Sequence, residues 1–358
     1  MGQIASRANN FGLLRVALAV MVVICHACVL LDGSKLHEPL FFLTHTVSLG
    51  DVAVDGFFLI SGYLVLQSLN NSRSGLEFIG KRFLRIYPGY IVACVGSLFL
   101  GFASGGSLPR LNASLVFDSV FRVVYLDDVS MDHAFVGVPT QGLNGSLWSI
   151  AYEFRCYILL MFVAALGLTR SKKLMTALVL SLLMWAIWLD GSHQSFALSF
   201  LLGTAVMNAR TFSLFGVGCL FYLLRETIPL RGLYAGASAL LLAVLLPFRH
   251  LDLFAIAVFG GYLLFWLALK ARTASWSKLA NKTDLSYAIY LYGWPVTCLI
   301  IWYRHEDINR WLLSALSIAA AAFIAFVSWT LVEKPALSLK SLFVRRPTMD
   351  AELISNIR

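Results

Sequence analysis

The chain has little charge, because Lys, Arg, Asp and Glu make up only 13% of its 358 residues while hydrophobic residues make up 59%. A soluble domain averages about 25% charged residues, so the composition excludes a soluble fold. Low-complexity tracts, internal repeats and linkers are also missing, and this favours a single domain over residues 1–358. There is no HExxH motif and no thiolate cluster outside the apolar runs, so no metal site is predicted.

The six cysteines do not form a disulfide framework, because each lies inside an apolar run, where cysteine is typical of a small core residue. Cys25 and Cys28 have CxxC spacing, but no second pair of ligands accompanies them. The net charge of +9 is interpreted as basic cytoplasmic loops, not as a nucleic-acid-binding surface.

Apolar runs of about 20 residues, each long enough to cross a bilayer, recur along the whole chain. They predict an all-α, polytopic integral membrane protein with about ten transmembrane helices. The expected spans are 11–31, 51–69, 86–104, 147–168, 173–190, 196–224, 233–247, 252–270, 285–303 and 310–332. The sixth is either one long or broken crossing, or two short ones divided near residues 208–210. The first carries Arg15 and lacks a cleavage site, so it is expected to be retained and not to act as a signal peptide.

The distribution of Lys and Arg predicts the orientation, because cytoplasmic loops carry the excess. With ten spans, twenty of the 28 basic residues fall on the side of the two termini, Arg210 among them, and six fall on the other side. Both termini are therefore expected in the cytoplasm, for a protein of the bacterial inner membrane. Residues 105–146 are expected to form an extracytoplasmic loop. Residues 333–358 are expected to form a basic cytoplasmic tail, with Pro335 ending the last helix.

Arg15 and His26 are unusual because charged or titratable residues inside a membrane helix are costly and need a partner or a function. Eleven positions correspond to about three turns, so the two side chains share a helix face, roughly 16 Å apart along the axis. The structural alternative is a snorkelling Arg and a hydrogen-bonded core His. The functional interpretation is an anion anchor at one membrane surface and a proton acceptor deeper inside.

Further polar residues interrupt the apolar runs. Asp55 and Ser61 lie in the second span, and Arg82 and Arg85 lie in KRFLRIYPGY just before the third. These two arginines either bind anionic lipid or clamp a phosphate, since the guanidinium group matches phosphate oxygens. Glu153 lies in the fourth span, where the alternative is a structural ion pair with a nearby Arg. The possible substrate-contacting or pore-lining residues are Ser61 in the second span, Trp148 and Ser149 in the fourth, and Tyr290 and Trp294 in the ninth.

The order of these motifs resembles the type-3 membrane acyltransferases, which O-acetylate bacterial surface polysaccharides. The motifs are R-x10-H, FFLISGY, KRFLRIYP, LWSIAYE, SYAIYLYGWP and LVEKP, and the resemblance covers residues 11–335. It implies an acyl-CoA donor, most simply acetyl-CoA, and a sugar hydroxyl as acceptor. The matching positions are Arg15, His26, Arg82, Arg85, Trp148, Ser149 and Glu153. Gly293 departs from the pattern, since many members have His there.

Counting residues from the expected span ends places His26, Glu153 and Asp55 together, roughly 6–10 Å below the outer surface. The arginines gather instead at the cytoplasmic surface. The sequence thus predicts an O-acyltransferase in which His26 is the general base, oriented by Asp55 or Glu153, and Arg15, Arg82 and Arg85 hold the acyl-CoA.

The expected partners are acyl-CoA, a polysaccharide or lipid-linked glycan, and the lipid bilayer, without nucleic acid and without a bound cofactor. The alternative is a transporter or flippase for acyl groups, lipid-linked sugars or related small molecules, which also needs intramembrane charges. The absence of an inverted repeat counts against it. The sequence does not identify the glycan and hydroxyl that are acylated or the oligomeric state. It also leaves open whether the acyl group is acetyl or longer, and whether transfer is direct or passes through an acyl-enzyme.

Overall fold

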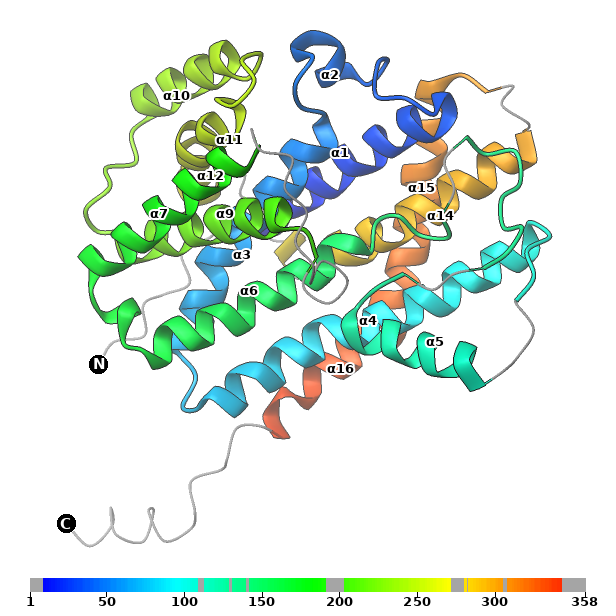
Figure 1. Ribbon diagram of the computed structural model, residues 1–358, viewed down its shortest axis with the longest axis horizontal. Coiled ribbons are helices and arrows are strands. Elements are labelled where there is room, and N and C mark those ends of the chain that lie inside the picture. Colours follow the sequence, from blue (N-terminus) through cyan, green and yellow to red (C-terminus); the bar gives the residue numbers. More distant parts are fainter. Residues whose placement is uncertain are drawn as a thin grey trace, which may run out of the picture.

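The protein is a bundle of helices in which elements far apart in the sequence lie side by side (Figure 1). The computed structural model describes residues 9–108, 113–128, 131–139, 142–190, 203–271, 280–281, 283–304 and 308–342. Within these ranges the regular structure is helical, apart from one isolated β-bridge between Ser107 and Asp132. Eight of the described helices are long and apolar enough to cross a membrane. The prediction of an all-α, polytopic membrane protein is confirmed.

The elements follow one another with mostly short connections. The first half contains α1 (Phe11–Asp32), α2 (Pro39–Thr44), α3 (Leu49–Asn70), α4 (Gly75–Ala103), α5 (Ala113–Tyr125) and α6 (Trp148–Ala165). The second half contains α7 (Lys172–Asp190), α9 (Ala205–Leu223), α10 (Gly232–Leu245), α11 (Asp252–Ala255), α12 (Gly261–Leu269), α14 (Ser286–Arg304), α15 (Arg310–Ser328) and α16 (Lys334–Ser338). Single π-helical turns, η2 (Ile256–Gly260) and η3 (Trp329–Glu333), join α11 to α12 and α15 to α16.

Each of the ten expected spans overlaps a helix. The helices α10, which is only 14 residues long, and α14 are not among the eight candidate membrane spans. The sixth expected span corresponds to α9, which runs without a break through residues 208–210, while residues 196–202 lie outside the described part of the chain. Pro335 does not end the last helix as predicted. The helix continues from α15 through the π-helical turn η3 into α16, and Pro335 is the second residue of α16. The π-helical turn interrupts the regular hydrogen-bond pattern just before Pro335, so its missing backbone N–H is accommodated. Of the expected tail, residues 343–358 lie outside the described residues.

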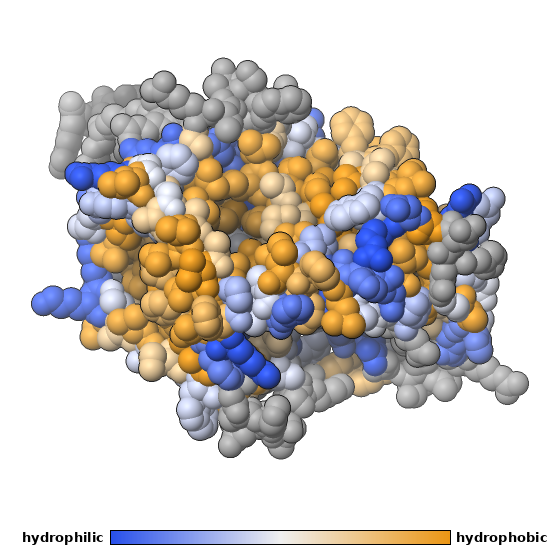
Figure 2. All heavy atoms as spheres, turned by 90° about the horizontal axis from the view of Figure 1, so that it is seen from above, coloured by the Kyte–Doolittle hydropathy of each residue, from blue (hydrophilic) through white to orange (hydrophobic). Residues whose placement is uncertain are grey.

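The surface fits a lipid environment, because large apolar side chains are exposed on many of the helices. Phe99, Phe162, Trp188 and Phe323 are each at least 60% exposed. Figure 2 shows apolar side chains covering broad areas of one face of the molecule. Exposed apolar surface of this extent is unusual for a soluble monomer, and it agrees with the membrane interpretation.

The centre of the bundle is formed by α1, α3, α9 and α14. The helices α3 and α9 cross so closely that a Cβ atom on Gly62 would lie 1.9 Å from the backbone oxygen of Phe215. Small residues allow membrane helices to approach in this way. The helices α1 and α3 are antiparallel, with Gly50 next to Cys25 and Gly56 next to Leu18. One end of the bundle therefore holds Arg15, and the opposite end holds His26.

The segment expected to be an extracytoplasmic loop contains the helix α5, which lies along α4 (Figure 1). The Tyr87 hydroxyl donates a hydrogen bond of 2.8 Å to the backbone oxygen of Val124, and the Tyr90 hydroxyl donates to that of Asp127. Both tyrosines lie inside α4, well before its end at Ala103. The segment thus folds back along the bundle, and the side of the membrane to which it belongs stays a prediction.

Candidate active site

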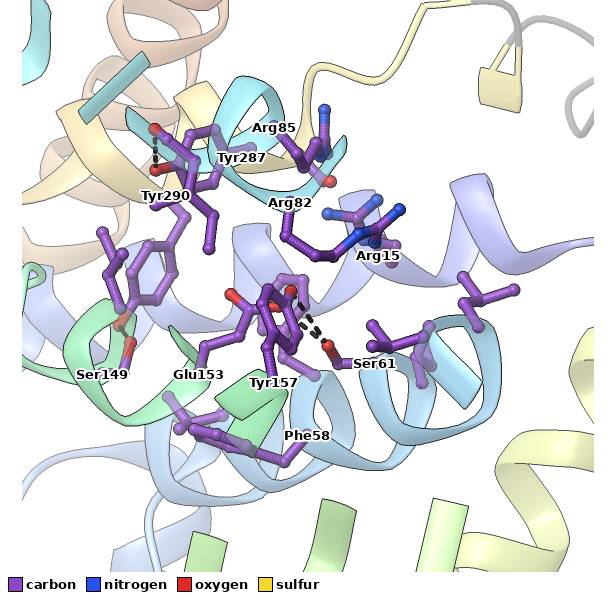
Figure 3. A pocket seen from close by; sticks show the side chains of 18 residues that line it. Arg15, Phe58, Ser61, Arg82, Arg85, Ser149, Glu153, Tyr157, Tyr287 and Tyr290 are labelled. Carbon is purple, nitrogen blue, oxygen red and sulfur yellow. Dashed lines mark hydrogen bonds between the residues drawn. The ribbon is translucent and has the colours of Figure 1, made fainter. Parts of the chain in front are cut away.

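One cavity lies between α1, α3, α4, α6 and α14 and has a volume of about 100 Å³; we call it the arginine pocket. Figure 3 shows Arg15, Arg82 and Arg85 toward one end, Ser149 at the other, and Ser61, Glu153 and Tyr157 between them. The polar residues that line it are Arg15, Ser61, Arg82, Arg85, Ser149, Glu153, Tyr157, Ser286, Tyr287 and Tyr290. The expected clustering of the three arginines is therefore observed.

Two of the three arginines share one carboxylate. Arg15 Nη1 lies 2.5 Å and Arg85 Nη2 lies 2.6 Å from Asp284 Oδ2. Arg85 Nη1 also lies 3.9 Å from Glu333 Oε2. Burial alone would raise the pKa of the Asp284 carboxyl, but Arg15 and Arg85 beside it hold that pKa well below its usual range. Arg15 and Arg85 therefore each have a carboxylate partner within the protein, although they share that of Asp284.

Arg82 differs from the other two. Its Nη2 donates to Ser68 Oγ at 3.2 Å, its Nε is buried without a hydrogen bond, and its guanidinium carbon lies 5.8 Å from the centre of the Tyr157 ring. No carboxylate of the described residues forms a salt bridge with it. Arg82 is partly buried, and Glu153 attracts its charge without forming a salt bridge. Its charge is therefore the least compensated of the three, which makes Arg82 the strongest candidate for binding an anion.

Glu153 lies in the arginine pocket. Its Oε1 accepts hydrogen bonds from Ser61 Oγ at 2.8 Å and from the Tyr157 hydroxyl at 2.5 Å. The expectation that Glu153 lies level with His26 is wrong. Ser61 is the thirteenth residue of α3 and Glu153 the sixth of α6. The N-terminus of α6 therefore lies roughly 10 Å deeper in the bundle than the N-terminus of α3. Counting residues from the span ends assumes that the ends are level and does not reveal this shift.

His26 lies in a second, larger cavity of about 510 Å³, which we call the histidine cavity. Its ring packs edge to face against Trp294, with the ring centres 4.9 Å apart. Nδ1 of His26 is buried and has no hydrogen-bond partner. The polar, charged and aromatic residues lining this cavity are His26, Lys35, His45, Thr46, Ser48, Asp51, Asp55, Trp148, Arg210, Thr211, Arg249, Asp252, Tyr290 and Trp294.

Asp55 does not orient His26, because it is bound to a different partner. Arg210 Nη2 lies 2.5 Å from Asp55 Oδ2 and its Nε lies 3.1 Å from Oδ1, while Nη1 reaches Asp252 at 3.4 Å. The distribution of Lys and Arg along the sequence puts Arg210 on the cytoplasmic side. It lies instead in α9, at the end of the bundle that holds His26. A charge within an apolar run, the signal that distinguished Arg15, also marked Arg210.

The remaining predicted residues lie at or near the border of the two cavities. Trp148 lines the histidine cavity and the adjacent Ser149 lines the arginine pocket. Ser149 Oγ and the Tyr290 hydroxyl are 2.7 Å apart, and Tyr290 lines both cavities. Trp294 is oriented by a 3.3 Å hydrogen bond from its Nε1 to the backbone oxygen of Gly142. Ser61, by contrast, lies with Glu153 inside the arginine pocket.

The bundle, the arginine pocket and the cavity around His26 define a multi-pass membrane protein with internal cavities lined by charged side chains. A family model described as "Acyltransferase domain" matches residues 9–333, and the chain belongs to this family. The expected enzyme class, an O-acyltransferase, is therefore confirmed.

The chain is similar to three named proteins. It is 28% identical over 367 residues to Nodulation protein 10 of Rhizobium leguminosarum bv. viciae, covering 94% of this chain and 95% of the relative. It is 28% identical over 350 residues to the O-acetyl transferase of Shigella phage Sf6, covering 94% and 98%. It is 30% identical over 120 residues to Acyltransferase MdmB of Streptomyces mycarofaciens, covering 32% and 29%. No solved structure matches the chain.

Proposed function

We propose that the enzyme transfers an acyl group, most simply acetyl, from cytoplasmic acyl-CoA to a hydroxyl of an exported or cell-surface polysaccharide or glycolipid. The observation that carries this proposal is the pair of cavities that meet at Tyr290, one lined by arginines and the other containing His26. A donor with phosphates fits the first, and an acceptor with hydroxyls fits the second. The full-length similarity to a phage O-acetyl transferase supports the same reaction.

The donor would be held by its phosphates. Arg82, which lacks a carboxylate partner among the described residues, would bind a phosphate directly, while Arg15 and Arg85 would position it through their network with Asp284. An arginine can form two parallel hydrogen bonds to phosphate. The apolar lining beyond the arginines, which includes Phe57, Phe58 and Ile60, would then accommodate the pantetheine arm.

The acceptor would enter the histidine cavity. Carboxylate and guanidinium groups such as those of Asp55 and Arg210 can hydrogen-bond sugar hydroxyls, and the rings of Trp148 and Trp294 offer flat apolar faces. A neutral imidazole can accept a proton from the acceptor hydroxyl. His26 is suited to this role because its buried Nδ1 has no partner.

In the proposed reaction, the acceptor oxygen attacks the thioester carbonyl carbon while His26 takes the hydroxyl proton. The carbon–sulfur bond then breaks, the ester forms, and the thiolate leaves and is protonated to free CoA. The thioester must lie at the border near Tyr290 for this to happen. The proposal assigns the arginine pocket to the cytoplasmic side and the histidine cavity to the opposite side, an orientation that the positive-inside bias supports.

The test is direct. Purified protein in nanodiscs, given acetyl-CoA and surface glycan extracted from a strain that lacks the gene, should release free CoA thiol and add the mass of an acetyl group to the glycan. Release of thiol without modified glycan would exclude the transfer, and neither product would exclude the proposed donor. Comparing the surface glycans of the host with and without the gene identifies the acylated sugar.

A further inference from the structure

The border between the two cavities is formed by few residues. Val54 and Tyr290 line both of them. Two consecutive residues of α6 face different sides, since Trp148 lines the histidine cavity and Ser149 the arginine pocket. A molecule that passes from one cavity to the other must therefore move past the Tyr290 side chain.

The side chain of Tyr290 is held in place at both ends. Its ring lies edge to face against Phe57, with the ring centres 5.9 Å apart, and its hydroxyl forms the 2.7 Å hydrogen bond with Ser149 Oγ. Both residues are buried, with Tyr290 7% and Ser149 8% exposed. The bond joins α14 to α6, so breaking it frees the border between these two helices.

The two cavities differ in their capacity for water. A site of about 10–15 Å³ holds one water when polar partners are available. Both cavities can therefore hold water, but the histidine cavity, at about 510 Å³ and lined by charged groups, can hold far more than the arginine pocket of about 100 Å³. Water in the histidine cavity is thus the competitor of the acceptor hydroxyl for the same thioester.

We propose that the Tyr290–Ser149 pair is a partition that separates the donor thioester from water in the histidine cavity until an acceptor is bound. The pair thereby determines the specificity for a sugar hydroxyl over water. This inference rests on the proposed function. Without the partition, a water oxygen attacks the thioester carbonyl carbon and the carbon–sulfur bond breaks. One water proton passes to the leaving thiolate, and the products are free CoA and a carboxylic acid.

The experiment measures acetyl-CoA hydrolysis without acceptor and acetyl transfer with acceptor, on the same purified protein. Tyr290→Phe and Ser149→Ala each remove one side of the hydrogen bond with little change in volume. Both are expected to raise the ratio of hydrolysis to transfer roughly fivefold, the effect of losing one neutral hydrogen bond on the population of an open state. The double variant is expected to show no further rise, because both changes break the same bond.

Tyr292→Phe is the matched control. Tyr292 is buried on the same helix but faces Gly96 and lines neither cavity, so its variant should keep the wild-type ratio. An unchanged ratio in Tyr290→Phe and Ser149→Ala, even with a lower total rate, would overturn the partition. If one of the two does not fold, the other decides alone. If the wild-type protein itself transfers nothing, it is the proposed function that fails.

Discussion

Replacing Arg82 by alanine is expected to weaken acyl-CoA binding more than any other single change in the arginine pocket. The reason is that Arg15 and Arg85 share the carboxylate of Asp284, while Arg82 has no salt bridge with a described carboxylate. Hydrogen bonds to charged groups contribute about 1.5–3 kcal/mol. The expected loss of affinity is therefore roughly 10- to 100-fold, with Arg82→Lys between alanine and wild type because it keeps the charge and loses the fork.

The assay is titration calorimetry of acetyl-CoA into purified protein in nanodiscs, with circular dichroism to confirm the fold. Arg225→Ala is the control, because Arg225 is 43% exposed, pairs with Glu226 and lies outside the arginine pocket. Arg15→Lys should reduce affinity less than Arg82→Ala, since Asp284 already binds Arg15. Unchanged affinity in Arg82→Ala, or an equal loss in Arg225→Ala, would refute the assignment of Arg82 as the phosphate-binding residue.

Three further predictions concern the proton acceptor, the ion-pair network and the orientation. His26→Ala should lower transfer about 10²- to 10⁴-fold while acetyl-CoA affinity stays near wild type; near-normal transfer in correctly inserted protein would leave only a packing role. Asp284→Asn should lower the free energy of unfolding by roughly 1–3 kcal/mol, measured by thermal unfolding in detergent, because two arginines lose their shared partner. The pKa of Asp284 in the folded protein lies below its usual value despite burial. The difference in free energy of unfolding between wild type and Asp284→Asn should therefore be largest above about pH 4 and decrease as the pH falls. A difference that stays constant down to pH 2 would contradict the ion-pair explanation. A cysteine at Ser34 should react with an impermeant thiol reagent in intact cells and one at Ser171 should not, against the low background of six buried native cysteines; the reverse pattern would invert the proposed orientation.

The sequence was sufficient for the fold class and for the grouping of Arg15, Arg82 and Arg85. Apolar runs predict membrane crossings directly. Arg82 and Arg85 come just before the expected third span, and Arg15 lies near the start of the first, so all three are expected near the same membrane surface. The sequence did not predict the depth of Glu153 in the bundle. The helices α3 and α6 begin at different depths, and no local sequence pattern indicates that difference. The motif order found the right residues, but it did not divide them between two cavities.

Pairing was the other limit. Asp55 stood out as a charge within an apolar run, whereas Arg210 was counted with the cytoplasmic residues, and nothing in the sequence assigned the two to one another across 155 positions. Asp284 carried no such signal, since it lies outside the apolar runs, just before α14. Its importance comes from two arginines on two other helices, which only the packed bundle brings together.

The ion pair between Asp55 and Arg210 also has a consequence for how the protein is made. Asp55 lies in the second long helix to leave the ribosome, and its counter-ion follows only when α9 has been synthesised. The close crossing of α3 and α9 at Gly62 and Gly218 likewise cannot form before then. During synthesis α3 must therefore remain near water or an accessory protein, because a lone carboxylate is poorly tolerated in hydrocarbon. The histidine cavity is thus completed late, by a helix made long after His26 itself has entered the membrane.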